Sequence, residues 1–203
     1  MIACEELEFS YDGQRQFRFP AFSLEVGEQL LISGASGSGK STWLQLLAGW
    51  RRPQKGKVYL ENQALLDLPE QQRASQVAVM HQNMHFIPSL NSLENVQLSA
   101  QLGGVTLRSD LPDLFEQLGL QDKTKQSVQT LSRGEQQRLS FIRALAAQPK
   151  VLLADEPTAS LDDEHCHELI RLMQSHTQNS ACSLIVISHD QRLKASIERS
   201  ITL

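Results

Sequence analysis

The chain has few of the features that mark secreted or membrane-spanning proteins. Its three cysteines, Cys4, Cys166 and Cys182, are odd in number and far apart, which is typical of reduced thiols and argues against a disulfide framework or a cysteine metal site. No uncharged apolar stretch is long enough to cross a bilayer, and the N-terminus lacks the basic start and apolar core of a signal peptide. These absences favour a cytoplasmic protein.

Strong charge of either sign is also missing. The formal net charge is −4, and no long basic run is present. Because a basic patch is the usual electrostatic footprint of a nucleic-acid partner, we expect no nucleic acid as the main ligand. Internal repeats, low-complexity linkers and coiled-coil heptads are absent too. With 40% hydrophobic residues, the 203 residues predict one domain around a substantial core.

A glycine-rich loop suited to phosphate is what the chain does contain. It stands between an apolar run at residues 29–33, typical of a buried strand, and a run at 42–48, typical of a helix. In this arrangement successive N–H groups turn toward an anion at the helix N-terminus. Lys40 is expected to reach the β- and γ-phosphates and Ser41 to hold Mg²⁺. The residues predicted to bind a nucleoside triphosphate are Gly34, Ala35, Ser36, Gly37, Ser38, Gly39, Lys40, Ser41 and Thr42.

A second element of phosphate chemistry lies at residues 151–157, Val-Leu-Leu-Ala-Asp-Glu-Pro. An apolar strand delivers two acids at its C-terminal end, where open α/β sheets bind ligands. Asp155 is suited to hold Mg²⁺, and Glu156 to orient and deprotonate an attacking water. By itself such a run also fits a solvated strand end. The phosphate loop upstream favours the catalytic interpretation.

The order of the elements indicates an α/β P-loop NTPase fold with a mainly parallel core sheet. Residues 2–11 and 17–24 alternate like strands of an N-terminal antiparallel β subdomain. Further strand candidates lie at 29–33, 57–61, 77–81, 150–155, 183–188 and 199–203. A helical subdomain is predicted at about residues 89–147, with the rest of the single domain at about 1–88 and 148–203.

Two histidines, His165 and His167, flank Cys166 in a segment, 162–176, whose apolar spacing predicts a helix. Residues two apart on a helix point to different faces. We therefore favour a solvated helix face over a metal site for these side chains.

Residues 131–138, Leu-Ser-Arg-Gly-Glu-Gln-Gln-Arg, stand just ahead of a helix and shortly before the two acids. They resemble the signature sequence of the ATP-binding cassette (ABC) ATPases, usually Leu-Ser-Gly-Gly-Gln. Other family elements occur in the family's order, and the resemblance covers essentially all of the chain. Tyr11 matches the aromatic residue that stacks on adenine, Gln82 the Q-loop glutamine, Asp162 of Ser160-Leu-Asp162 the D-loop, and His189 the switch histidine. Taken singly, Tyr11 also fits an ordinary strand aromatic, Gln82 a polar strand end and His189 a surface or capping histidine.

The resemblance implies a composite catalytic site that hydrolyses ATP. In the family, the signature residues, here Ser132 and Gly134, face the ATP held by the opposite subunit, which implies a head-to-tail homodimer formed on ATP binding. The implied catalytic residues are Glu156, His189, Lys40 and Gln82, and the implied Mg²⁺ ligands are Ser41, Gln82 and Asp155. The cofactors are ATP and Mg²⁺, and Asp162 belongs to the same nucleotide site.

Transport by such an ATPase needs a separate integral membrane permease subunit, because this chain has no span of its own. The resemblance places the permease contact near residues 82–95 and the protein at the inner face of the cell membrane. The sequence of this stretch is most similar to that of the small ATPases of the lipoprotein-releasing and macrolide-exporting group. Residues 82–95 also fit packing inside the helical subdomain. A soluble non-transport ABC ATPase and a nucleotide-dependent regulatory module remain alternatives, and the sequence gives neither the substrate nor the direction of transport.

The signature departs from its family at Arg133, where glycine is usual, and at Glu135, where glutamine is usual. Ser132 and Glu135 fit a capping box, in which Glu and Gln serve equally well. We expect Arg133 to start the helix in ordinary helical conformation, so that the N–H groups of Ser132 and Gly134 remain available.

Overall fold

The computed structural model describes residues 1–13, 15–159 and 161–203. Its strands are β1 (Ile2–Cys4), β2 (Leu7–Ser10), β3 (Gln16–Phe19), β4 (Phe22–Leu24), β5 (Gln29–Ser33), β6 (Val58–Leu60), β7 (Gln63–Ala64), β8 (Val77–Met80), β9 (Val151–Asp155), β10 (Ser183–Ile187) and β11 (Ser200–Thr202). Its α-helices are α1 (Lys40–Leu47), α2 (Glu70–Gln76), α3 (Ser92–Leu102), α4 (Leu111–Gln117), α5 (Arg133–Leu145), α6 (Asp163–Asn179) and α7 (Gln191–Ser196). Short 3-10 turns lie at Leu65–Asp67, Gln121–Lys123 and Val128–Thr130.

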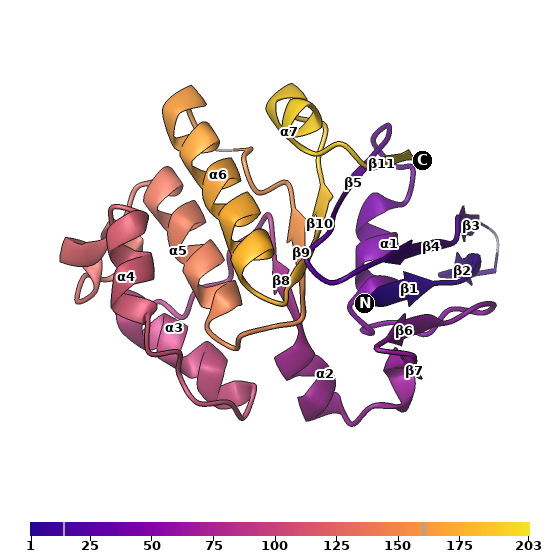
Figure 1. The fold of residues 1–203 in the computed structure, drawn as a ribbon, viewed down its shortest axis with the longest axis horizontal. Helices are drawn as coiled ribbons and strands as arrows, with labels where there is room; N and C mark the ends of the chain where they lie inside the picture. Colours follow the sequence, from indigo (N-terminus) through magenta and orange to yellow (C-terminus); the bar gives the residue numbers. More distant parts are fainter. Residues whose placement is uncertain (14, 160) are drawn as a thin grey trace.

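The strand before the phosphate loop, β5, lies inside a five-stranded sheet of order β11-β5-β10-β9-β8, and every pairing in it is parallel. Side chains of β9 alternate between two buried clusters. Leu152 and Ala154 face the helices on one side, whereas Val151 and Leu153 face α1 on the other. Because helices cover both faces, the strands are apolar throughout. The predicted parallel core sheet is confirmed, and Figure 1 shows it between α1 and α6.

An antiparallel sheet of order β4-β1-β6-β7 packs on the other side of α1, and β2 pairs with β3 in a separate ribbon. The predicted antiparallel β region is confirmed, and each of the segments 2–11 and 17–24 contains two short strands that pair in different sheets. The first breaks at the exposed residues Glu5 and Glu6. The second breaks at Pro20, which has no N–H to donate to a ladder.

Helices α3, α4 and α5 pack together on the far side of α6 from α1, as Figure 1 shows, and share one buried cluster with α6. The start of α3 has a capping box, in which the Asn91 side chain accepts the Glu94 N–H at 2.9 Å and Glu94 accepts the Asn91 N–H at 2.8 Å. The division into subdomains at about 1–88, 89–147 and 148–203 stays a prediction. Among the described helices, none is long and apolar enough to cross a membrane.

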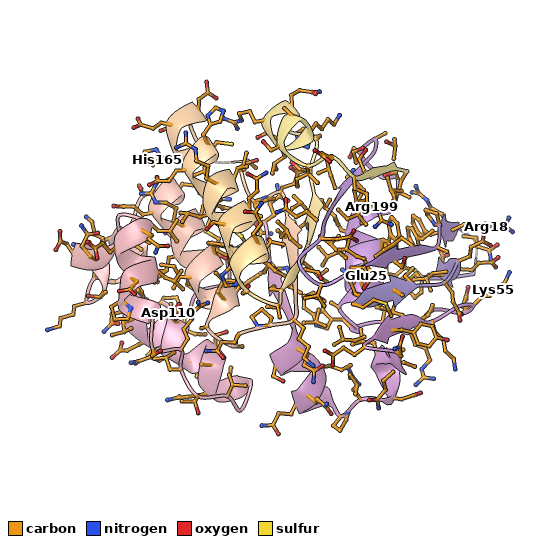
Figure 2. The ribbon with its side chains drawn as sticks, viewed as in Figure 1. Arg18, Glu25, Lys55, Asp110, His165 and Arg199 are labelled. Atoms are coloured by element: carbon orange, nitrogen blue, oxygen red, sulfur yellow. The ribbon has the colours of Figure 1, made fainter. Side chains whose placement is uncertain are left out.

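The two histidines near Cys166 lie on α6 and have different partners. His165 Nδ1 is 2.8 Å from both carboxylate oxygens of Asp162, and His167 Nδ1 is 2.6 Å from the Asp163 carbonyl oxygen. Figure 2 shows His165 at the outer surface of the molecule. Within the described residues, no group of three or more potential metal ligands occurs. His167 is exposed and His165 is half-buried, and both side chains contact groups on their own helix or at its start.

Candidate nucleotide-binding site

The phosphate loop joins β5 to α1 and needs glycine at its end. Gly39, the residue before the helix, has a φ of 101°, in the left-handed region that favours glycine. A Cβ at Gly39 would lie 2.6 Å from the Phe17 ring, so space as well as conformation excludes a side chain. The loop places the N-terminus of α1 beside the C-terminal end of the parallel sheet, which is where an anion is bound best.

A cavity of about 670 Å³ opens over this loop. The predicted residues that line it are Gly34, Ala35, Ser36, Gly37, Gly39, Lys40, Ser41, Thr42, Gln82, Asp155, Glu156 and His189. They are distant in sequence and meet because β5, β8, β9 and β10 end at the same edge of one sheet. Tyr11 and Ser38 are not among the lining residues. The Ser38 hydroxyl is buried and has no hydrogen-bond partner in the described part of the chain.

Lys40 points back into the loop. Its Nζ donates to the carbonyl oxygens of Gly34 and Ala35, each at 2.9 Å. Phosphate oxygens carry more negative charge than these carbonyls and form stronger charge-assisted hydrogen bonds. The ammonium is therefore placed to exchange both carbonyls for the phosphates of a nucleotide.

The cavity also offers oxygen ligands of the kind that Mg²⁺ prefers, namely the Ser41 hydroxyl, the Gln82 amide oxygen and the Asp155 carboxylate. Burial and the neighbouring Glu156 raise the pKa of Asp155, and Lys40 opposes the shift. A nearby cation stabilises the ionised form of a carboxylate that its surroundings otherwise disfavour. The residues present therefore fit a magnesium ion.

The second acid, Glu156, is held by two neighbours. Its Oε2 accepts the Ser188 hydroxyl at 2.8 Å, and its Oε1 lies 2.7 Å from His189 Nδ1. Its own backbone has a φ of 49°, and its N–H donates to the Ile187 carbonyl at 2.8 Å. The turn after β9 thus aims the carboxylate into the cavity and next to the residue that follows β10.

Tyr11, predicted to stack on adenine, lies beside the cavity with its side chain already engaged. Its hydroxyl is 3.1 Å from Thr42 Oγ1, and the Arg51 guanidinium lies 4.6 Å from its ring centroid. The residue is 53% exposed. One ring face is therefore covered by a cation, and the adenine contact stays a prediction.

Sequence reasoning missed two residues that do line the cavity, Arg15 and Phe17. The Arg15 guanidinium lies 4.8 Å over the Phe17 ring and donates to the Gly37 carbonyl of the phosphate loop. Alternation predicts a strand for Phe17, which is correct, but it does not indicate which loop that strand approaches. The contact is tertiary, and the sequence carries no local signal for it.

The signature residues lie elsewhere, at the start of α5. Ser132 Oγ accepts the Glu135 N–H at 3.2 Å, and Glu135 Oε2 accepts the Ser132 N–H at 2.7 Å. The predicted capping box is thus present, and the helix begins at Arg133, which has no positive φ. Ser132 and Gly134 do not line the cavity of their own chain.

The D-loop residue Asp162 also lies outside that lining. It caps α6 by accepting the His165 N–H at 2.9 Å. Ser160, part of the same prediction, lies outside the described residues. What Asp162 does toward a nucleotide therefore stays a prediction.

Comparison with known proteins gives the same family. A family model described as ABC transporter matches residues 19–159. The lipoprotein-releasing system ATP-binding protein LolD of Idiomarina loihiensis is similar, with 33% identity over 98% of this chain and 92% of its own length. An uncharacterized ABC transporter ATP-binding protein of Escherichia coli K12, YbbA, is 39% identical over 87% of this chain and 81% of its own length.

Solved structures agree with the sequence relatives. A dimeric structure of MJ0796, described as a bacterial ABC transporter cassette, covers 100% of this chain and 94% of its own with a TM-score of 0.89 at 28% identity. A dimeric post-hydrolysis state of the same cassette bound to ADP and Pi has a TM-score of 0.88 at 27% identity, with the same coverage. With the phosphate loop, the acid pair and the capped signature helix in place, these matches show that the chain belongs to the ABC transporter family, as one of its ATP-hydrolysing cassettes.

Proposed function

We propose that two copies of this cassette join head to tail on ATP and drive a separate integral membrane permease. The observation that carries this proposal is the separation of two halves of a site within one chain. The phosphate loop lines the cavity, whereas Ser132 and Gly134 lie apart from it at the capped start of α5. A complete site then takes its signature from a second copy, and the dimeric MJ0796 structures support that arrangement.

In the proposed reaction, water attacks the γ-phosphate in line and Glu156 accepts a proton from the water. Lys40 exchanges its two loop carbonyls for phosphate oxygens. His189 lies on Glu156 Oε1, so it must leave that oxygen before Glu156 takes the proton. Moving the His189 N–H onto the γ-phosphate accomplishes this and stabilises the transferring group, while Ser188 keeps the carboxylate oriented.

Ser41, Gln82 and Asp155 are the residues that would hold Mg²⁺. When bound, the ion neutralises phosphate charge and orients the phosphate oxygens. The start of α5 in the second copy contributes further positive potential at the γ-phosphate through the Gly134 N–H and the helix dipole, whereas the Ser132 N–H is already donated to Glu135.

ATP links the two cassettes and hydrolysis removes the link, so that each cycle closes and opens the dimer. We propose that the permease receives this motion near residues 82–95, at the inner face of the cell membrane. A hollow of about 250 Å³ in this region is lined by Asn83, Met84, His85, Phe86, Pro88, Val128, Gln129, Arg133 and Gln136. Met84 is buried and Phe86 packs against the core, whereas Ile87 is 43% exposed. The inward packing of this segment therefore leaves Ile87 exposed for the proposed permease contact.

The experiment that tests the proposal is co-purification with candidate permeases. Since one relative is named for a lipoprotein-releasing system, a permease of that kind is the first to try. We expect a complex that contains two copies of the chain and releases phosphate faster than the chain alone. Ile87→Glu should weaken capture, and the control Leu102→Glu, at a position 72% exposed on α3, should not.

Two other results would point to other functions. A chain that hydrolyses ATP but is captured by no permease would be a soluble ABC ATPase. A chain that binds ATP without steady-state phosphate release would be a regulatory module.

A further inference from the structure

Arg143 is a cation that the mechanism above does not use. It lies in the last turn of α5, the helix that begins with the signature. Burial lowers the pKa of its guanidinium, and among the described residues no carboxylate forms an ion pair with it. Burying a charge without a counterion is unfavourable unless hydrogen bonds replace the lost water.

The partners in those hydrogen bonds are the carbonyl groups of Met84 and His85, shortly after Gln82. Arg143 Nη1 donates to the His85 carbonyl at 3.1 Å, and Nη2 donates to the Met84 carbonyl. The guanidinium carbon lies 4.6 Å from the Phe86 ring centroid, which is a cation–π contact. His85 has a φ of 45°, a conformation that L-residues rarely adopt. One side chain thus holds three consecutive residues in an unusual backbone path.

The residues that follow are attached to the same group of helices. Asn95 of α3, which is 3% exposed, accepts the Ile87 N–H at 2.8 Å. Its amide also lies 3.2 Å from the carbonyl oxygens of both Ile87 and Leu90, to which it donates. Residues 84–90 are therefore fixed to α3 and α5.

His81, the residue before Gln82, contacts both the α1 side of the molecule and the segment held by Arg143, since its ring packs edge-on against the His85 ring with centroids 5.6 Å apart. It follows β8, and the Trp50 ring just after α1 stacks on it, with ring centroids 5.0 Å apart and 15° between the planes. Along the chain, Gln82 and Asn83 connect His81, which follows the sheet, to the segment that Arg143 holds, and the His81–His85 ring contact spans this connection. Gln82 is also the residue of this pair that lines the nucleotide cavity.

We propose that Arg143 is a positioning residue that sets where Gln82 stands in the nucleotide site. When α5 shifts relative to the parallel sheet, the contacts of Arg143 move residues 84–86 with the helix. Because Gln82 lies two residues before this segment, it is displaced as well. The inference rests on the role proposed above for Gln82 and names the side chain that controls it.

Steady-state phosphate release from the purified chain tests this, with Mg²⁺ and ATP varied separately. Arg143→Met should lower kcat about tenfold or more and raise the Mg²⁺ concentration for half-maximal rate, with the KM for ATP within about threefold of the native value. Arg143→Lys keeps the charge but reaches only one carbonyl, so its kcat and its Mg²⁺ requirement should fall between those of the native chain and those of Arg143→Met. Arg171→Met, on the exposed face of α6, is the matched control and should match the native chain.

A double-mutant cycle with Gln82→Ala separates positioning from general weakening. If Arg143 acts through Gln82, the double variant should be about as slow as Gln82→Ala alone. The inference would be overturned if the kcat losses of the two single variants multiplied in the double variant. It would also be overturned if Arg143→Met had native kinetics while Gln82→Ala was slow. Either result would leave the proposed function intact. Normal turnover of Gln82→Ala would instead remove the role of Gln82 and the inference with it. If Arg143→Met does not fold, Arg143→Lys and Phe86→Leu test the inference instead. Both variants must then raise the Mg²⁺ concentration for half-maximal rate, and an unchanged value in either would overturn the inference.

Discussion

At the scale of single residues, the carboxylate proposed as the general base, Glu156, is positioned by its neighbours. Glu156 was predicted from the acid pair at the end of its strand and His189 from the family resemblance, and the structure brings both to one cavity. The sequence did not predict that Ser188 contacts one carboxylate oxygen of Glu156 and His189 the other. These contacts form because β9 and β10 are neighbours in the sheet. Arg15, Phe17 and the anchoring role of Arg143 were missed for the same reason.

Glu156→Gln should keep ATP binding but slow hydrolysis by about 10²-fold or more, the range expected when a general base is lost. The variant should therefore accumulate as an ATP-bound dimer, which size-exclusion chromatography detects. Lys40→Ala should instead weaken nucleotide binding and give no such dimer. Near-normal turnover of Glu156→Gln would remove this residue from the role.

Stability should depend on pH through His176, which lies on α6 near the Phe141 ring of α5. Burial, with a smaller effect of Arg108, lowers the His176 pKa from 6.5 to about 4. The unfolded chain therefore binds this proton at higher pH than the folded one, so stability is full above pH 6.5 and falls as pH drops toward 4. The loss should reach about 2 kcal/mol at pH 5.

Urea denaturation at several pH values measures this effect. His176→Gln should flatten the decrease below neutral pH, and the exposed His167→Gln should retain it. The same slope in the native chain and in His176→Gln would assign the decrease to other groups.

At the scale of elements, the sequence predicted best where the signal is local. Strands β5, β9 and β10 are continuous apolar runs buried on both faces, and each appears within one residue of its predicted bounds. The breaks at Glu5-Glu6 and at Pro20 were missed, since alternation continues across them while the pairing partner changes. The start of α5 was predicted correctly because a capping box is itself a local signal.

The start of α5 also gives a prediction for the unusual signature. Arg133 occupies the first helical position with an ordinary backbone, so nothing there requires glycine. Arg133→Gly should change phosphate release by less than about tenfold, or 1.4 kcal/mol. Ser132→Arg should nearly abolish it, because the side chain removes the cap and fills the space that the γ-phosphate of the second copy needs. A hundredfold gain in Arg133→Gly would mean that the native signature is degenerate.

At the scale of the whole molecule, the two halves of the proposed catalytic site lie apart within one chain. One chain shows the cavity and the signature helix as separate features, so only the family resemblance predicted that they meet between copies. Without nucleotide, the bridging ligand is missing and we expect the chain to be mostly monomeric in dilute solution. Light scattering with and without ATP on the Glu156→Gln variant measures this. A tight nucleotide-free dimer across another surface would contradict it.

The order of the parallel sheet has a consequence for the making of the protein. The phosphate-loop strand β5 has β10 on one side and β11 on the other, with Leu31 opposite Val186 and Ser200. On the ribosome, β5 emerges well before β10 and remains without either neighbour while residues 34–182 are translated. Pairings between such distant segments form slowly, and the waiting strand is an exposed apolar segment that a chaperone can bind. The phosphate loop is thus supported by its complete sheet only after β10 and β11 have been translated.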